Sequence, residues 1–368
     1  MLARDGVAAH ATTAVVALAV FAIARAAFAP RRGEADLGAG HDVGPAQAAA
    51  RAAQPGRGRT AISPWQIPWA GWKDIFQRVW REIGEDRLLA IAAGVVFFGL
   101  LALFPAITAL VSSYGLFASP ATIAEHLSFL ASAMPAGAFS VVQDQIARVV
   151  ANGDVALGFK FVFGLALALW SANAGMKAII DALNVVYEEE EKRGFFELNL
   201  VSLAFTIGAL VAALIAVAGV VGVPAAMAGL GLGEDAKVLL ATLRWPTLFV
   251  ALTLGLSVLY RFGPSRTQPK WRWASVGALA GAAAWIAGSA ALSFYISRFG
   301  DYDATYGSLG AAIGLMMWMW LSAIVVLFGA ELNAEIEHQT AIDSTRGAPK
   351  PLGGRGARMA DSVGESAA

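Results

Sequence analysis

The stretch TYGSLGAAIGLMMWMWLSAIVVLFGA, residues Thr305–Ala330, decides the class of fold. It contains no Asp, Glu, Lys or Arg, and about 20 apolar residues are enough for a helix to cross the hydrocarbon core of a bilayer. The whole chain agrees with this stretch, because 57% of its 368 residues are hydrophobic and 15% are charged. Soluble domains carry about 25% charged residues. A soluble globular protein is therefore excluded.

Five further segments have the same apolar character. Lys160 and Arg244 lie near the starts of two of them, where a long side chain can reach the membrane interface. The runs lack the two-residue alternation of a transmembrane β-barrel. The segments are Leu88–Ser112, Val155–Met176, Asn199–Gly222, Val238–Tyr260 and Trp273–Ile296. We expect an all-α, polytopic helical membrane protein with six core transmembrane helices plus an interfacial amphipathic helix.

The interfacial helix is predicted just before the first span. Its apolar residues recur at steps of three and four, and charged or polar residues fill the other side. The apolar set is Trp69, Trp72, Phe76, Val79, Trp80 and Ile83, and the polar set is Lys73, Asp74, Gln77, Arg78, Arg81 and Glu82. This pattern predicts a helix in the headgroup layer with its indoles at the interface. A face that docks a partner is the alternative.

The segments outside this core are expected to have no packed core of their own. Ala11–Ala29 is apolar apart from Arg25, and we interpret it as an uncleaved signal-anchor helix, with a non-inserted extension as the alternative. Pro30–Pro64 has almost no large apolar residue and is predicted to be a disordered linker. The predicted division is an N-terminal extension at 1–64, a six-helix membrane domain at 65–338 and a disordered cytoplasmic tail at 339–368.

The orientation follows from the distribution of Lys and Arg over the loops. These residues concentrate before the first span, between the second and third spans, between the fourth and fifth, and in the tail. The alternate loops contain few of them. Because positive loops stay in the cytoplasm, both ends of the core are predicted to be cytoplasmic, in the inner membrane of a bacterial cell.

Six polar residues are candidates for a functional cluster at the cytoplasmic ends of the first, second and sixth helices. They are Asp86, Arg87, Asn173, Lys177, Asp181 and Glu331. Glu331 follows a long uncharged run and is the first candidate for coupling to a proton or cation, with an interfacial anchor as the alternative. We expect at least one of the three carboxylates to pair with Arg87 or Lys177 from another helix. The cluster would then lie beneath a helix kink at Pro105. Solvated helix ends are the alternative.

No enzyme signature is present. The chain has no cysteine, its four histidines are scattered, and it lacks the Walker A, nucleophile-elbow, zincin and dinucleotide-binding patterns. Lys plus Arg equals Asp plus Glu at 27 each, so the chain has no overall basic field for nucleic acid. We expect no catalytic, cofactor or metal site and no nucleic-acid partner. The spacing of Gly277 and Gly281 fits helix packing.

Four stretches together resemble the YihY/BrkB family of bacterial inner-membrane proteins. They are DRLLAIAAGVVFFGLLALFPAI (Asp86–Ile107), LALWSANAGMKAIIDALNVVYEEEEKR (Leu167–Arg193), WRWASVGALAGAAAW (Trp271–Trp285) and YGSLGAAIGLMMWMWLSAIVVLFGAELNAEIE (Tyr306–Glu337). The resemblance covers about Trp72–His338. It implies six helices with both ends in the cytoplasm. Members carry the labels virulence factor BrkB, linked to serum resistance, and ribonuclease BN, a tRNA-processing enzyme.

The residues argue against the ribonuclease label, because metal-assisted phosphodiester hydrolysis needs clustered ligands in an aqueous site. The leading expectation is a membrane protein that acts in transport or in lipid handling at the cell envelope. Its partners would be membrane lipids and a lipid-linked or small-molecule substrate. A non-transporting scaffold for envelope assembly is the alternative, and a tRNA-processing nuclease is third and disfavoured.

Overall fold

The structure is a computed structural model, and it describes residues 45–114, 143, 144, 147, 159–229, 234–299 and 309–367. Every element in these residues is helical, and one isolated antiparallel bridge joins Pro269 to Thr345. The elements are α2 (Pro45–Ala52), a 3₁₀ turn η2 (Pro64–Gln66), α3 (Trp69–Glu85), α4 (Leu88–Tyr114), α8 (Phe159–Val186), α9 (Phe195–Gly229), α10 (Glu234–Phe262), α11 (Trp271–Phe299), α13 (Leu309–His338) and α14 (Arg358–Asp361). The all-α fold class is confirmed.

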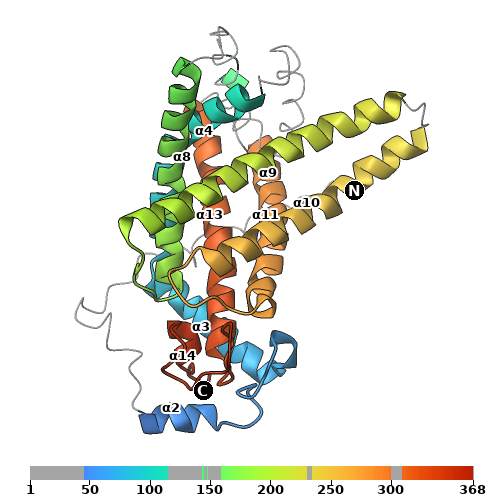
Figure 1. Cartoon of the computed structure of the whole chain (residues 1–368). Helices are drawn as coiled ribbons and strands as arrows, with labels where there is room; N and C mark the ends of the chain where they lie inside the picture. The colour runs from blue at the N-terminus through green and yellow to red at the C-terminus, as the bar shows by residue number, and fades with distance from the viewer. Residues whose placement is uncertain are drawn as a thin grey trace.

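Six long helices occupy the six segments that the sequence predicts. In Figure 1, α4, α8, α11 and α13 run along the long axis of the molecule, and α9 and α10 cross it obliquely. Among the described residues, α9, α10, α11 and α13 are each long and apolar enough to span a membrane, and α3 with α4 qualifies as a bent pair. The fold is that of a multi-pass membrane protein. The count of six spans stays a prediction.

Helix α13 is the centre of the bundle, because it packs against α4, α8, α11 and α3. Its approach to α11 is close enough to require glycine. A Cβ atom on Gly277 would lie 1.9 Å from the carbonyl oxygen of Gly329. The Asn333 side chain joins the same helices by accepting from the Gly277 amide at 2.7 Å and donating to the Ala274 carbonyl at 3.0 Å. The interpretation of Gly277 as a packing residue is confirmed.

The amphipathic helix α3 forms as predicted and bends from α4 by 59°. Trp69, Phe76 and Trp80 are exposed, as expected for residues at an interface. The solvent-facing position predicted for the charged residues is wrong at Asp74, Arg78 and Glu82, which are buried. Their burial is tolerated because the end of α13 and the tail supply charged and hydrogen-bonding partners.

A region that we call the polar cap consists of residues 45–68, α3 and residues 339–367. It lies at the lower end of the molecule in Figure 1, where α2, α3 and α14 gather. Arg59 is buried and donates to the carbonyls of Gln339 and Gly364. Arg355 is buried as well and donates to those of Ala341 and Ala360.

The polar cap corrects the expectation of disorder for 339–367 and for the described part of the linker, 45–64. Composition indicates that these segments cannot bury an apolar core. They pack nonetheless, because buried guanidinium groups satisfy backbone carbonyls from distant parts of the chain. Residues 1–44, with the predicted signal anchor, lie outside the described residues. Helix α4 continues through Pro105, and the predicted kink there stays a prediction.

Candidate functional site: buried carboxyls at the base of the bundle

Glu331 lies on α13 where the bundle meets the polar cap. Its side chain is buried, with 1% of the residue exposed. Its Oε2 atom has no hydrogen-bond partner among the described residues. Of the charges around Glu331, that of Asp86 acts on it most strongly, followed by those of Glu335 and Glu82. A charged carboxylate in such a place is unfavourable, so this group calls for a bound proton or another ligand.

The two other glutamates at this end of α13 both have arginine partners. Glu335 forms a buried ion pair with Arg78 of α3. Glu337 pairs with Arg266, whose Nη2 lies 2.6 Å from the glutamate Oε1, and both side chains are 0% exposed. Buried pairs of this kind are maintained only with both partners, because removing one leaves an uncompensated charge. Glu331 therefore differs from its two neighbours on the same helix end.

Asp86 follows α3 and is partly buried. Burial raises the pKa of its carboxyl, and the negative charges of Glu82 and Glu188 raise that pKa further. Asp86 therefore holds a proton at a pH where an ordinary aspartate has lost it. Leu88, two residues after Asp86, packs in the same buried cluster as Ala330, next to Glu331, so the chain brings together two carboxyls that are far apart in sequence.

Two residues beside these carboxyls have a rare backbone conformation. Arg87, directly after Asp86, has a φ of +53°, and Glu188, two residues after α8, has a φ of +52°. Residues other than glycine adopt this left-handed region at a cost of about 1–3 kcal/mol, and such positions gather at functional sites. Arg358 of the tail lies 3.0 Å from the Glu188 carboxylate, so the polar cap contacts one of the two positions.

The six residues of the predicted cluster divide into two groups. Asp86 and Glu331 interact at the base of α4 and α13. Asn173 and Lys177 bind α9 instead: Lys177 Nζ donates to Asn199 at 2.6 Å, and Asn173 accepts from Thr206 at 3.4 Å. Asp181 and Arg87 are exposed.

The expected ion pair of Asp86, Asp181 or Glu331 with Arg87 or Lys177 does not form within the described part of the chain. The ion pairs found there involve other residues. The physical reason is twofold. The side chain of Arg87 is exposed beside its left-handed backbone, and Lys177 is engaged by α9.

Sequence reasoning missed Arg78 and Arg266 as partners in this region. A signal for Arg78 was available, since Asp74, Arg78 and Glu82 are spaced by four and so share one face of α3. A charged face of this kind can be buried when another element supplies oppositely charged partners. Arg266 gives no such signal, because its partner Glu337 lies 71 residues further along the chain.

An apolar cavity of about 290 Å³ lies further along the bundle from these carboxyls. Helices α4, α8, α11 and α13 enclose it, with Val96, Ile179, Trp285, Met319 and Ala323 among its lining residues. Polar links in the wall include the Trp285 indole N–H, which donates to the Ser322 hydroxyl at 2.9 Å, and that hydroxyl, which donates to the Trp318 carbonyl at 2.8 Å.

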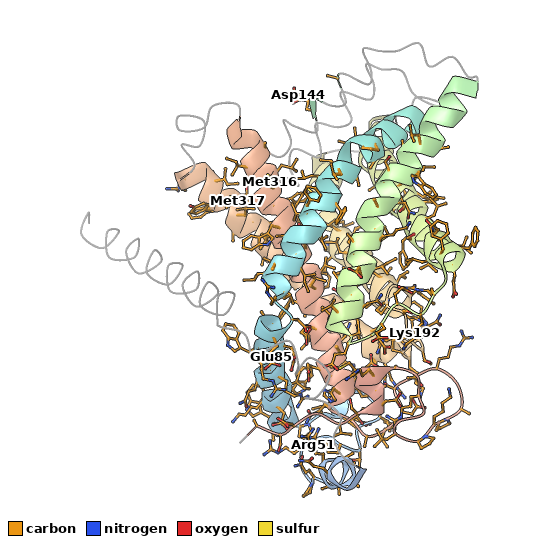
Figure 2. The ribbon with its side chains drawn as sticks, turned by 90° about the vertical axis from the view of Figure 1, so that its left-hand side faces the viewer. Arg51, Glu85, Asp144, Lys192, Met316 and Met317 are labelled. Atoms are coloured by element: carbon orange, nitrogen blue, oxygen red, sulfur yellow. The ribbon has the colours of Figure 1, made fainter. Side chains whose placement is uncertain are left out.

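A buried apolar layer separates the cavity from Glu331. It consists of Leu88, Ala92, Leu327 and Ala330, and Leu327 also lines the cavity. In Figure 2, Glu85 labels the end of α3, next to the start of α4. Met316 and Met317 label the part of α13 that is farther from the polar cap. The described residues contain no group of three or more His, Asp or Glu placed to hold a metal ion.

A bundle of long apolar helices with a buried carboxyl at its base defines a multi-pass integral membrane protein. Residues 79–352 match the family described as virulence factor BrkB. The chain belongs to this family, and the resemblance found in the sequence is confirmed.

The curated relatives include the ribonuclease-like protein YfkH of Bacillus subtilis, 33% identical over 71% of this chain and 93% of the relative. The UPF0761 membrane protein PBPRA3489 of Photobacterium profundum is 28% identical over 73% of this chain and 82% of the relative. The UPF0761 membrane protein MS0032 of Mannheimia succiniciproducens is 24% identical over 74% of this chain and 92% of the relative. No solved structure matches the chain.

Proposed function

We propose that the protein acts in transport or in lipid handling at the cell envelope, and the apolar cavity is the observation that carries this proposal. Its volume of about 290 Å³ is close to the lower end of the range for small-molecule sites, roughly 300–1,000 Å³. The walls are apolar apart from the Ser322 hydroxyl and indole N–H groups. Such a wall suits an acyl chain or another apolar portion of a lipid-linked or small-molecule substrate.

The location that we propose is the bacterial inner membrane, with both ends of the core in the cytoplasm. The distribution of Lys and Arg supports this orientation. The test is a set of reporter fusions, with fusions at Glu190, Ser265 and Gly353 expected inside and fusions at Ser140, Gly231 and Asp301 expected outside. A loop that reports from the opposite side would overturn the topology.

The function is tested with the purified full-length protein in liposomes that contain a fluorescent lipid or a trapped solute. Acceleration of either movement is the expected result. Ala323→Leu adds bulk to the cavity wall and is expected to reduce the rate. Val250→Leu, at an exposed position of α10, is the matched control and is expected to leave the rate unchanged. No movement across a broad panel would contradict the proposal.

A non-transporting scaffold is the second candidate, and the polar cap favours it. The cap orders a large polar surface at one end of the bundle, as a docking platform would require. The liposome experiment separates the two candidates, because a scaffold moves neither lipid nor solute.

We further propose that the protein is not an enzyme and has no nucleic-acid partner or resident cofactor. The ribonuclease-like name belongs to the relative in Bacillus subtilis. In this chain, the supporting argument is the absence of a recognised catalytic pattern and of a basic field. RNA cleavage that copurifies with the protein and is lost in an Asp181→Ala, Glu331→Ala double variant would overturn this proposal.

A further inference from the structure

The three glutamates at the end of α13 present a contrast that packing alone does not explain. Glu335 and Glu337 are buried against Arg78 and Arg266. Glu331 is equally buried, yet its Oε2 atom lacks a hydrogen-bond partner in the described residues. A glutamate with a purely structural role at such a depth would be expected to have a cation or several donors around it.

The charges that face Glu331 come from every side of the base and are mostly acidic. Its own helix contributes Glu335, and the neighbouring elements contribute acidic groups and a phenol. These are Glu82 from α3, Asp86 from the α3–α4 junction, and Tyr187 and Glu188 from the end of α8. Adding a further negative charge at Glu331 would therefore meet repulsion from its surroundings.

The nearby cations are engaged elsewhere. Arg78 binds Glu335, Arg81 contacts Glu82 at 3.1 Å, and Arg358 contacts Glu188 at 3.0 Å. Arg87 is exposed. No described element therefore supplies Glu331 with a positive charge among the ion pairs found.

The missing partner is better supplied by a proton than by a metal ion. A metal ion needs several oxygen ligands at once, and no group of three carboxylates or histidines in the described part of the chain is placed to supply them. A proton needs a single oxygen and removes the charge. Burial also raises the pKa of Asp86, which lies outside the membrane span, so the neighbouring carboxyl favours its protonated form too.

We propose that Glu331 is a proton-binding site at the base of the bundle and that Asp86 acts on it from the α3–α4 junction, where Leu88 packs in the same buried cluster as Ala330. Loss of the proton would place two negative charges at the contact of α4 with α13. Their repulsion would favour separation of the helix ends at the apolar layer of Leu88, Ala92, Leu327 and Ala330. This second step rests on the proposed function, whereas proton binding does not.

The site is tested by labelling the full-length protein in lipid nanodiscs with dicyclohexylcarbodiimide, an apolar reagent that reacts with protonated carboxyls. Mass spectrometry measures the labelled fraction of Glu331 between about pH 5 and about pH 9. Labelling is expected at low pH and should fall about tenfold for each pH unit above the midpoint. Glu335 and Glu337 are internal controls and should stay unlabelled, because each is engaged in a buried ion pair with an arginine.

Two variants sharpen the experiment. Glu331→Gln removes the labelled position. Asp86→Asn removes the strongest neighbouring charge, so the labelling midpoint of Glu331 should move to lower pH. The inference is overturned if Glu331 is unlabelled throughout, is labelled equally across the range, or keeps its midpoint in Asp86→Asn. It is also overturned if sodium, compared with choline at constant pH, blocks the labelling, because a metal cation would then occupy the site.

The liposome assay tests the second step separately. Movement of lipid or solute should change with pH in the wild-type protein and lose that dependence in Glu331→Gln. If Glu331 is labelled as expected but neither lipid nor solute moves, the proposed function is overturned and the proton-binding site is still supported. Movement with the same pH dependence in Glu331→Gln would overturn the coupling of the proton to the helices.

Discussion

The apolar bundle and the polar cap bury opposite kinds of residue. On the bundle, large apolar side chains face outward, with Phe97 and Phe294 both 60% exposed. Where the polar cap meets α13, the charged side chains of Arg78 and Glu335 are 3% and 1% exposed. The difference follows from the surroundings that each region is built for. Lipid solvates apolar side chains, so the bundle has little hydrophobic drive to hide them. The cap instead depends on ion-pair and hydrogen-bond partners for the charges that it buries.

The largest expected effect comes from breaking a buried pair of the cap. Glu335→Gln leaves the buried guanidinium of Arg78 without a counter-charge, and we expect a loss of about 3–5 kcal/mol of stability. The measurement is the apparent melting temperature of the purified protein in detergent. Glu85→Gln is the matched control, because its carboxylate is 58% exposed and its pair with Arg81 at 3.8 Å should contribute about 0–1 kcal/mol. Equal shifts in both variants would show that the cap is solvated.

Truncation after Gly353 sharpens the same comparison. It removes the backbone carbonyl that accepts from Arg59 and the Ala367 amide that donates to Asp74 at 2.8 Å. Each buried group left unsatisfied should cost about 1–3 kcal/mol. Limited proteolysis should then cleave the N-terminal part of the cap, which we expect to resist cleavage in the full chain. Unchanged resistance would indicate that the tail contributes nothing to the cap.

A smaller effect is expected from the closest helix contact of the bundle. Gly277→Ala places a methyl group against the Gly329 carbonyl, and overpacking of this kind costs about 1–3 kcal/mol. Gly94→Ala on α4 is the control, since its added methyl group meets nothing within 4 Å. Thermal unfolding of the two variants in detergent compares them directly. A loss as large in Gly94→Ala would refute the close approach of α11 to α13.

The smallest expected effect is the dependence of stability on pH that arises from Asp86. Because the folded protein raises the pKa of Asp86, the folded state binds its proton more tightly than the unfolded chain does. Wild-type stability should therefore be complete below about pH 4, the ordinary pKa of an aspartate, and should fall as pH rises above it. Asp86→Asn removes this decline, so its melting temperature should match the wild type at low pH and exceed it at high pH. If the melting temperatures of the two proteins change in parallel with pH, the raised pKa of Asp86 is contradicted.

Much of the site was visible in the sequence, although its pairing was not. Asp86 and Glu331 could be named because ionisable residues at the edge of long apolar runs are rare. Their neighbours could not, since Arg78 and Arg266 reach Glu335 and Glu337 from elements far away along the chain. The expected pair with Arg87 or Lys177 from another helix does not form in the part of the chain that the structure describes, because Arg87 is exposed and Lys177 is engaged by Asn199 of α9.

The sequence by itself determined the class of the protein, its helical segments and its family. Those properties depend on the length and spacing of apolar residues, which are local and additive. Only the tertiary structure decided that the tail packs, that charged residues of α3 are buried, and that Glu331 has no arginine partner among the described residues. Such outcomes depend on which distant groups meet, because a buried charge is stable or costly according to its partner and not according to its own position in the chain.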